Sequence, residues 1–410
     1  MWLSNVVHME KKADQNRARA EPADAGTPQS LYVHVPFCVR KCGYCDFYSL
    51  AGATQDLMRA YVAAVEQEGG ALPETPLRTL YVGGGTPTAL PPPLLRRLLD
   101  GLRRRFTLGR PPATPSVPGG EAPEFTVEAN PGVLDDALLD AMQDAGVNRV
   151  SLGVQSFHPE TLATLGRIHG PDQALRALDL LRRRGTRHVS LDLMFAVPGQ
   201  TLDQWLSDLR AAVASDVEHM SVYGLAIEPH TPLGRRVAAG DLAPLPDEAY
   251  AEMQMATRQA LLAAGYEHYE LSNFARPGRR CRHNLTYWHN RSYFALGPAA
   301  TSYVGGLRET RIADVAEYVR RIQAGSSPVA ETERLAGERR ARETAILGLR
   351  LLEGFDVAAF ERQTGFAPLH LFAEPIARHR GLGLLEVADG HVRLTPAALP
   401  VADSVLADFV

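Results

Sequence analysis

Three cysteines stand close together near the start of the chain, at Cys38, Cys42 and Cys45, in a C-x3-C-x2-C spacing. Three thiolates on one short loop can bind three irons of a cubane cluster and leave the fourth iron open. A structural zinc site would need four protein ligands, and the remaining cysteine, Cys281, lies far along the chain. The spacing therefore predicts a [4Fe-4S] cluster with an open position, and Cys281 is interpreted as a buried thiol outside it.

A run of three glycines, Gly83 to Gly85, follows a short apolar stretch and precedes Thr86. Without side chains the backbone can approach a ligand closely and turn its N–H groups toward a carboxylate. A tight strand-to-helix turn would need the same residue type. The run alone therefore leaves a ligand-binding and a purely structural interpretation open.

Polar residues recur along the next stretch of chain, at Glu128, Gln155, Arg167 and Asp192. A carboxylate at a strand end can accept hydrogen bonds from ribose hydroxyls, and an arginine can hold a carboxylate group. Each of these residues alone is more often a solvated loop residue. As a set on one face they favour a ligand site.

The elements that must position these residues are short apolar runs alternating with amphipathic helical patterns. Strands are predicted over 31–35, 80–82, 125–128, 149–152, 189–194 and 220–225, and helices over 55–67, 92–104, 135–144, 171–183 and 201–214. Such alternation indicates parallel β/α units, and six of them predict an α/β fold with a partial (β/α)6 barrel. Because the polar residues sit at the carboxyl ends of the strands, we expect the chemistry on that face.

The composition limits the class of protein. The chain has 410 residues, 43 Lys and Arg against 47 Asp and Glu, and a net charge of -4. This balance argues against a strongly basic nucleic-acid binder. No stretch approaches the ~18 apolar residues of a membrane span, and the first residues lack a secretory apolar core. Clustered cysteines are typical of metal binding in a reducing cytoplasm, so we expect a cytoplasmic protein.

The pattern divides the chain into several segments. Residues 1–28 are expected to be a disordered leader, and residues 29–305 the barrel, interrupted by a Pro-rich insert over 107–123. An aromatic-rich irregular segment is expected over 276–303, and a linker or helical connection over 306–333. Residues 334–410 predict helices followed by a hairpin around Asp389-Gly390, which is similar to a winged helix.

The motifs together resemble the radical S-adenosylmethionine (SAM) superfamily, and within it the oxygen-independent coproporphyrinogen III oxidase-like family. The resemblance rests on Tyr32-x-His-Val-Pro-Phe-Cys, on Gly-Gly-Gly-Thr-Pro-Thr over 83–88, on Gly-Val-Gln-Ser-Phe over 153–157 and on Asp-Leu-Met-Phe-Ala-Val-Pro-Gly over 192–199. It implies a radical SAM barrel whose open cluster iron binds the amino and carboxylate groups of SAM.

The resemblance also implies which residues contact SAM. Gly84, Gly85 and Thr86 would meet its methionine part, and Tyr32 and Tyr44 would pack near the adenine or the cluster. A buried core aromatic is the alternative for either tyrosine. The other implied SAM contacts are Glu128, Gln155, Arg167, Asp192 and, through its backbone, Ala226.

The family has two branches, and the residue two places after the third cysteine separates them. The resemblance implies that coproporphyrinogen dehydrogenases have a further cysteine at this position, whereas this chain has Phe47. A cysteine motif that ends in Cys45, Asp46 and Phe47 resembles that of the HemW-type haem chaperones. The segment His283-Asn-Leu-Thr-Tyr-Trp288 resembles them as well. The resemblance implies that His283 is a haem ligand, although a histidine beside such residues is often structural.

The expected function is haem binding and transfer to haem-accepting proteins, which we expect to be respiratory and membrane-associated. The alternatives are an anaerobic coproporphyrinogen III dehydrogenase and, less favoured, a nucleic-acid-binding module suggested by the winged-helix pattern. The expected cofactors are a [4Fe-4S] cluster, SAM and haem. We expect neither nucleic acid as a partner nor coproporphyrinogen turnover, and a homodimer is left open.

Overall fold

A curved, mainly parallel sheet forms the centre of the protein. The computed structural model describes residues 27–109 and 122–410. The sheet has nine strands in the order β11-β1-β4-β5-β6-β7-β8-β10-β9. Six of them run parallel in sequence order and form the expected partial barrel: β1 (Ser30–Val35), β4 (Thr79–Gly84), β5 (Glu124–Ala129), β6 (Arg149–Gln155), β7 (His188–Phe195) and β8 (His219–Gly224).

Both edges of this sheet carry strands that the chain adds later. β11 (Phe294–Leu296) pairs parallel with β1. At the other edge β10 (Asn273–Ala275) runs antiparallel to β8, and β9 (Glu267–Glu270) runs antiparallel to β10. The barrel therefore stays open.

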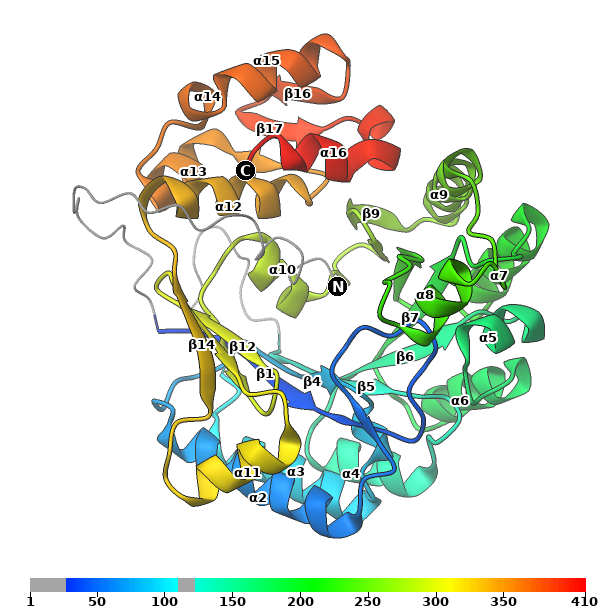
Figure 1. Ribbon diagram of the computed structural model, residues 1–410, viewed down its shortest axis with the longest axis vertical. Coiled ribbons are helices and arrows are strands. Elements are labelled where there is room, and N and C mark those ends of the chain that lie inside the picture. The colour runs from blue at the N-terminus through cyan, green and yellow to red at the C-terminus, as the bar shows by residue number, and fades with distance from the viewer. Residues whose placement is uncertain (1–26, 110–121) are drawn as a thin grey trace.

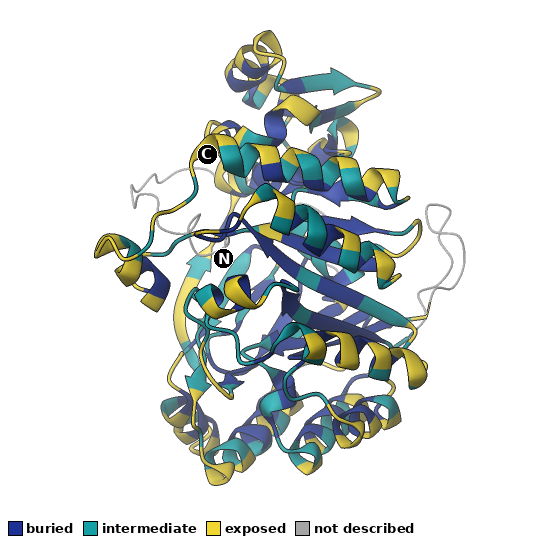
Figure 2. Ribbon diagram, turned by 90° about the vertical axis from the view of Figure 1, so that its right-hand side faces the viewer, coloured by how far each residue is buried: buried dark blue, intermediate teal, exposed yellow. Residues whose placement is uncertain are grey.

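Helices cover the convex side of the sheet (Figure 1). Their outward faces are exposed, whereas the strands between them are largely buried (Figure 2). Several begin at a side-chain cap: Thr54, Asp135 and Thr201 each accept a hydrogen bond from a backbone N–H in the first turn. The helices of this part of the chain are α2 (Gln55–Ala71), α3 (Pro92–Arg105), α4 (Asp136–Asp144), α5 (Pro159–Leu165), α6 (Pro171–Arg183), α7 (Leu202–Ala214), α8 (Pro232–Ala238), which packs against the cysteine loop, and α9 (Asp247–Ala263), with the 3-10 turn η1 (Pro87–Ala89).

The strands alternate between two kinds of side chain. Leu31, Val33 and Val35 of β1 are fully buried among the helices and belong to the main apolar core. The opposite face of the later strands carries polar side chains such as Thr126, Ser151 and Ser190. Because side chains alternate along a strand, this pattern places an apolar layer outside and a polar lining inside the barrel.

Residues 276–303, expected to be irregular, contain regular elements. They include α10 (Arg282–Trp288), β11 and β12 (Thr301–Val304). β12 continues into a three-stranded sheet with β13 (Leu307–Arg311) and β14 (Val329–Arg334), and α11 (Val315–Gln323) lies between the last two strands in sequence. β11 pairs with the distant strand β1, a contact that local periodicity does not report, whereas β12 pairs with its neighbour β13.

The C-terminal residues have an apolar core of their own, which includes Phe360, Phe372 and Phe409. Helices followed by a hairpin agree with the expected winged-helix-like pattern. This part stands across the opening of the barrel, at the top of the view in Figure 1. Its elements are α12 (Gly337–Leu349), β15 (Phe355–Asp356), α13 (Val357–Thr364), α14 (Pro368–Leu371), α15 (Ala373–Gly381), β16 (Leu385–Ala388), β17 (His391–Leu394), η2 (Pro396–Val401) and α16 (Ala402–Ala407).

Two expectations fall mostly on chain that is not described. Residues 1–26 of the predicted leader and 110–121 of the predicted insert lie outside the described residues. Among the helices of residues 27–109 and 122–410, none combines the length and the apolar character that crossing a membrane requires.

Candidate functional site

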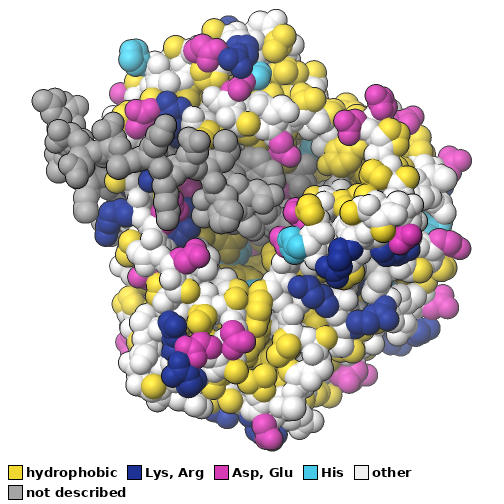
Figure 3. All heavy atoms as spheres, in the orientation of Figure 1, with side chains coloured by type: hydrophobic (Ala, Val, Ile, Leu, Met, Phe, Trp, Pro, Cys, Tyr) yellow, Lys and Arg dark blue, Asp and Glu magenta, His cyan; other side chains and the backbone are white. Residues whose placement is uncertain are grey.

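A cavity of about 1110 Å³ lies inside the curved sheet and extends beneath the C-terminal domain. The molecule is visibly hollowed between these two parts (Figure 3). Most of the expected site residues line this cavity: Cys38, Cys42, Tyr44, Cys45, Gly84, Gly85, Thr86, Glu128, Gln155, Arg167, Asp192 and Ala226. Tyr32 and His283 are not among its described lining residues.

The cysteine loop follows β1 and lies between two very short strands, β2 (Phe37–Cys38) and β3 (Leu50–Ala51), which pair with each other. Backbone hydrogen bonds tie its centre to the barrel: Gly43 N donates to Leu165 O (3.0 Å), and Leu233 N donates to Gly43 O (2.7 Å). All three cysteines are free and only partly buried. The loop is therefore anchored on two sides with its thiols facing the cavity.

Polar neighbours surround the thiols. Arg167 Nη1 donates to Cys42 Sγ (3.1 Å), and Thr86 Oγ1 lies 3.6 Å from Cys38 Sγ. Burial raises the pKa of Cys38, and it raises that of Cys45 to about 11. Without a metal these two thiols therefore stay protonated at neutral pH, and metal binding must displace their protons.

The donor set fits a cubane cluster better than one metal ion. Within the described part of the chain, no group of three or more His, Cys, Asp or Glu side chains converges as a single ion requires. A cubane differs because each of its cysteines binds a separate iron. Three thiols spread along one loop match that requirement.

The glycine turn brings backbone against the cysteine loop. Gly85 N donates to Val35 O (2.8 Å), and Thr86 N donates to Phe37 O (2.7 Å). A Cβ at position 85 would lie 2.7 Å from Phe37 O and 2.9 Å from Val35 O, both backbone atoms that cannot move aside. The turn therefore needs glycine for this close approach, and it carries Gly84, Gly85 and Thr86 into the cavity wall.

Two carboxyl groups project into the barrel beyond this turn. Glu128 accepts hydrogen bonds from Tyr81 Oη (2.7 Å) and Gly84 N (3.0 Å), and Asp192 accepts one from Ser151 Oγ (3.0 Å). Burial raises the pKa of Asp192, and it raises that of Glu128 to about 7. These are acceptors held in place by protein donors, as the binding of ligand hydroxyls would require.

The remaining expected SAM residues surround the same region. Gln155 ends β6 with a φ of 69°, a left-handed conformation that is uncommon for a residue with a side chain. Arg167 donates through Nη2 to Gly153 O (2.6 Å), while its buried Nε has no partner. Ala226 is exposed just after β8. Tyr32 lies apart from them, with its hydroxyl 3.0 Å from Nδ1 of His34.

His283 sits behind the cavity wall on α10. Its side chain is 1 % exposed, and both ring nitrogens have partners: Nδ1 is 2.8 Å from Thr79 Oγ1, and Nε2 is 2.8 Å from the Tyr287 hydroxyl. Burial lowers its pKa to about 4, so the imidazole is neutral. Haem ligation by Nε2 would require Tyr287 to move, whereas Tyr287 and Trp288 themselves line the cavity.

Sequence reasoning missed several polar residues that line the barrel. Tyr81, Thr126, Arg149, Ser190 and His219 all face the cavity. Their signal was the two-residue alternation of polar side chains along strands otherwise identified by their apolar content. Residues 399–404 of the C-terminal domain also line the cavity.

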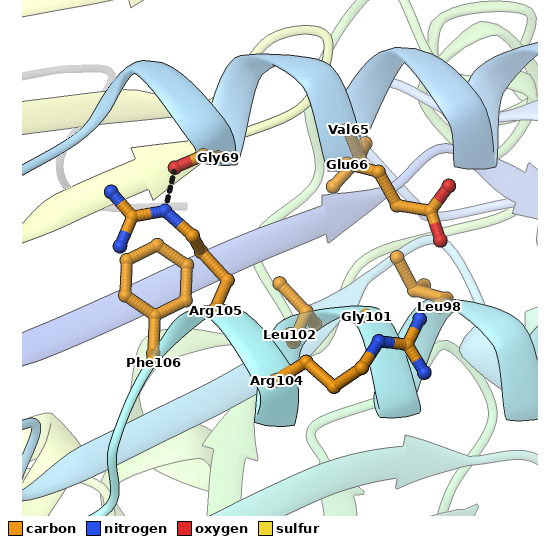
Figure 4. Close-up of a pocket in the computed structure, with 9 residues that line it drawn as sticks. All are labelled: Val65, Glu66, Gly69, Leu98, Gly101, Leu102, Arg104, Arg105 and Phe106. Atoms are coloured by element: carbon orange, nitrogen blue, oxygen red, sulfur yellow. Dashed lines mark hydrogen bonds between the residues drawn. The ribbon is translucent and has the colours of Figure 1, made fainter. Parts of the chain in front are cut away.

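A smaller hollow of about 300 Å³ lies on the convex side of the barrel between α2 and α3 (Figure 4). Leu98, Leu102 and Phe106 form much of its wall, and Arg105 Nε donates to Gly69 O (3.1 Å). None of the expected site residues lies there. The candidate chemistry is therefore confined to the barrel interior.

Comparison with known proteins decides the family. The Radical SAM superfamily profile matches residues 32–212, and that of the HemN C-terminal domain matches residues 335–401. The heme chaperone HemW of Bacillus subtilis is 34% identical over 93% of this chain and 99% of its own length. The chain belongs to the HemW family.

Other HemW proteins and one solved structure agree. The HemW proteins of Mycobacterium tuberculosis H37Rv and Escherichia coli K12 are 36% and 41% identical, over 93% and 67% of this chain and 94% and 69% of their own lengths. The coproporphyrinogen III oxidase HemN from Escherichia coli is similar in structure, with a TM-score of 0.79, 23% identity and coverage of 94% and 91% of the two chains. This structural likeness confirms the radical SAM fold of a HemW family member.

Proposed function

We propose that this protein is a haem chaperone that binds haem and transfers it to acceptor proteins, while carrying a [4Fe-4S] cluster and SAM. The observation that carries the proposal is the nearly full-length similarity to proteins named heme chaperone HemW. It includes both the radical SAM region and the C-terminal domain. Binding of a [4Fe-4S] cluster and of SAM is inferred from the match to the radical SAM superfamily.

The cavity supports a site for more than one ligand. At about 1110 Å³ it exceeds the ~300–1,000 Å³ typical of small-molecule sites. It joins the cysteine loop and the acidic barrel residues to Tyr287, Trp288 and the C-terminal domain. A cofactor at the cysteine loop would leave the rest of the space for a second, larger ligand.

The proposed division of work among the residues follows from their atoms. Cys38, Cys42 and Cys45 would hold the cluster, whose open iron would offer a position for the amino and carboxylate groups of SAM. The glycine turn would bring its backbone close to the ligand, while its N–H groups at Gly84, Gly85 and Thr86 stay bonded to the protein. Glu128 and Asp192 would accept hydrogen bonds from its hydroxyl groups.

Arg167 would complete the SAM site as a cation beside the cluster, because its guanidinium already reaches Cys42 Sγ. Tyr44, Gln155 and Ala226 would complete the wall around the bound molecule. Tyr32 would act from behind that wall, through its contact with His34.

The haem ligand is proposed to be His283, freed from Tyr287 when haem enters. Acceptors are proposed to be respiratory, membrane-associated haem proteins that this protein meets from the cytoplasm. The oligomeric state to be tested is a homodimer. Nucleic acid is not proposed as a partner. The proposed units are the barrel over 29–305, a connection over 306–333 and the C-terminal domain over 334–410.

The competing function is a coproporphyrinogen III dehydrogenase, which the fold alone would allow. The dehydrogenase branch is expected to have a cysteine two residues after the third cluster cysteine. This chain has Phe47 there, which is 50% exposed and lines the cavity. A phenyl ring there can neither ligate iron nor donate a thiol proton. The residue therefore favours the chaperone over the dehydrogenase.

The test is anaerobic reconstitution of the cluster, followed by two assays on the same sample. Haem titration monitored at the Soret band should saturate near one haem per chain, and coproporphyrinogen III should remain unconverted with SAM and reductant. His283→Ala should weaken haem binding or shift the band, whereas His289→Ala, just past the same helix, should not. Robust coproporphyrinogen conversion, or no haem binding by the intact protein, would overturn the proposed function.

A further inference from the structure

The floor of the cavity holds a buried cation that the proposed site does not use. Arg149 begins β6 two residues before Ser151, whose hydroxyl bonds Asp192, so it lies about 7 Å deeper than the carboxyl groups of the proposed SAM site. Its side chain lines the cavity, yet the residue is only 4% exposed. A guanidinium taken this far from bulk water needs compensating partners.

The protein leaves part of this guanidinium without a partner. Nη1 makes one long hydrogen bond, at 3.4 Å, to the carbonyl oxygen of Arg279. Nη2 is buried and has no hydrogen-bond partner among the residues that the structure describes. Leaving a buried charged donor unsatisfied is costly, so a free donor of this kind usually marks a missing acceptor.

A second unpartnered group lies beside it. Thr126 is fully buried, and within the described part of the chain its Oγ1 has no hydrogen-bond partner. Thr126 on β5 is the direct register partner of Arg149 on β6, and both residues line the cavity. Neighbouring strands lie about 4.8 Å apart, so one small oxygen-bearing group can contact both side chains.

Two carboxyl groups, Glu124 and Asp192, interact with Arg149, but each of them also has other partners. Glu124 faces Arg149, but it also pairs with Arg282 (3.9 Å) and accepts backbone N–H bonds from Arg282 and His283. His219 stays neutral, because burial and then Arg149 lower its pKa. Cys281 also stays neutral, because burial raises its pKa to about 12.

We propose that Arg149 and Thr126 form a carboxylate-binding subsite on the floor of the barrel, which receives an acid group of the ligand held in the cavity. Nη2 would donate to one carboxylate oxygen and Thr126 Oγ1 to the same group. This inference rests on the proposed function, under which the acid group is a propionate of haem. A small carboxylic acid from solution is the other source of the same chemistry.

The test compares haem with its dimethyl ester, whose two propionates carry no charge. The intact protein should bind haem about tenfold more tightly than the ester, as expected for hydrogen bonds to a charged group. Thr126→Val should lower that preference about threefold, because one of the two hydrogen bonds is lost, and Thr126→Ser should retain it. Arg149→Met should abolish it; if this variant fails to fold, Thr126→Val still decides, because removing an unpartnered buried hydroxyl should not destabilise the fold.

Further measurements separate this inference from the proposed function. If haem and ester bind equally tightly, or Thr126→Val keeps the preference, the subsite is wrong while the chaperone stands. If Thr126→Val weakens SAM instead of haem, the propionate assignment is overturned. If haem does not bind at all, acetate serves as the probe of the subsite. Compared with an equal concentration of chloride, acetate should raise the melting temperature of the intact protein but not that of Thr126→Val. Equal melting temperatures in acetate and chloride would overturn the subsite.

Discussion

Cys42 and Cys281 are the same residue type in two environments that favour different chemistry. Cys42 is partly exposed on the anchored loop, with the Arg167 guanidinium 3.1 Å from its sulfur. Cys281 is 3% exposed, and its sulfur lies 3.6 Å from an oxygen of Glu124. Burial raises the pKa of Cys281 to about 12. A thiolate is the form that binds iron, so the local setting favours Cys42 as a ligand and keeps Cys281 a thiol.

This difference predicts the outcome of two matched substitutions. Cys42→Ala should lose the cluster, because only two loop thiolates would remain to hold a cubane. Cys281→Ala should keep about four irons per chain and the broad visible absorption of the cluster. Iron analysis after anaerobic reconstitution checks both variants. Full iron content in Cys42→Ala would show that the loop is not the cluster site.

At the scale of elements, the turn between β4 and η1 joins the cysteine loop to the barrel. Its backbone N–H groups at Gly85 and Thr86 bond to carbonyl oxygens at the end of β1 and in β2. A φ of 106° at Gly84 and the close approach at Gly85 both require the absence of a side chain. The turn therefore couples the position of the SAM-facing backbone to the position of the cysteines.

Gly85→Ala should disturb this coupling. Its methyl group would lie 2.7 Å from Phe37 O, so the turn and the loop must separate, and SAM affinity should fall at least tenfold. Gly70→Ala is the matched control, since a Cβ there meets nothing within 4 Å and the position is an exposed one in α2. It should leave SAM affinity unchanged and stabilise the protein by about 0.5–1 kcal/mol. Calorimetric titration of both variants checks the prediction; equal affinities would contradict it.

At the scale of the whole molecule, the C-terminal domain closes the barrel by contacts with its antiparallel edge. Leu271 N donates to Arg350 O (3.1 Å), and the buried Glu270 carboxylate lies 3.8 Å from Arg350 Nη2. Burial raises the pKa of Glu270, and Arg350 opposes that rise. Residues 399–404 of the same domain complete the cavity wall. The size of the cavity thus depends on this interface.

Glu270→Ala should weaken the closure. Removing one member of a buried ion pair costs roughly 3–5 kcal/mol, so the free energy of unfolding should fall by that order and haem binding should weaken with it. Glu353→Ala is the control: its pair with Arg280 (3.0 Å) is exposed at the same interface and should cost less than about 1 kcal/mol. Urea unfolding of the two variants measures the difference. Similar losses in both would contradict a special role for Glu270.

Much of the barrel could be predicted because its information is local. Each parallel strand buries one apolar row and is separated from the next by an amphipathic helix, so the periodicity of the sequence located all six strands. The cysteine spacing was equally local, since one loop carries all three thiols. The glycine run and the later polar residues could be placed on one face because parallel strands share their carboxyl ends.

Only the tertiary structure decided which residues meet behind the cavity wall and on the floor of the barrel. The bond of His283 to Thr79 joins residues 204 positions apart, and no local pattern reports it. The strands β10 and β11 are three residues long and pair with the distant strands β8 and β1. The adjacency of Thr126 and Arg149 depends on strand register. Periodicity determines which face of an element is apolar, whereas long-range packing determines which polar groups meet and which are left without a partner.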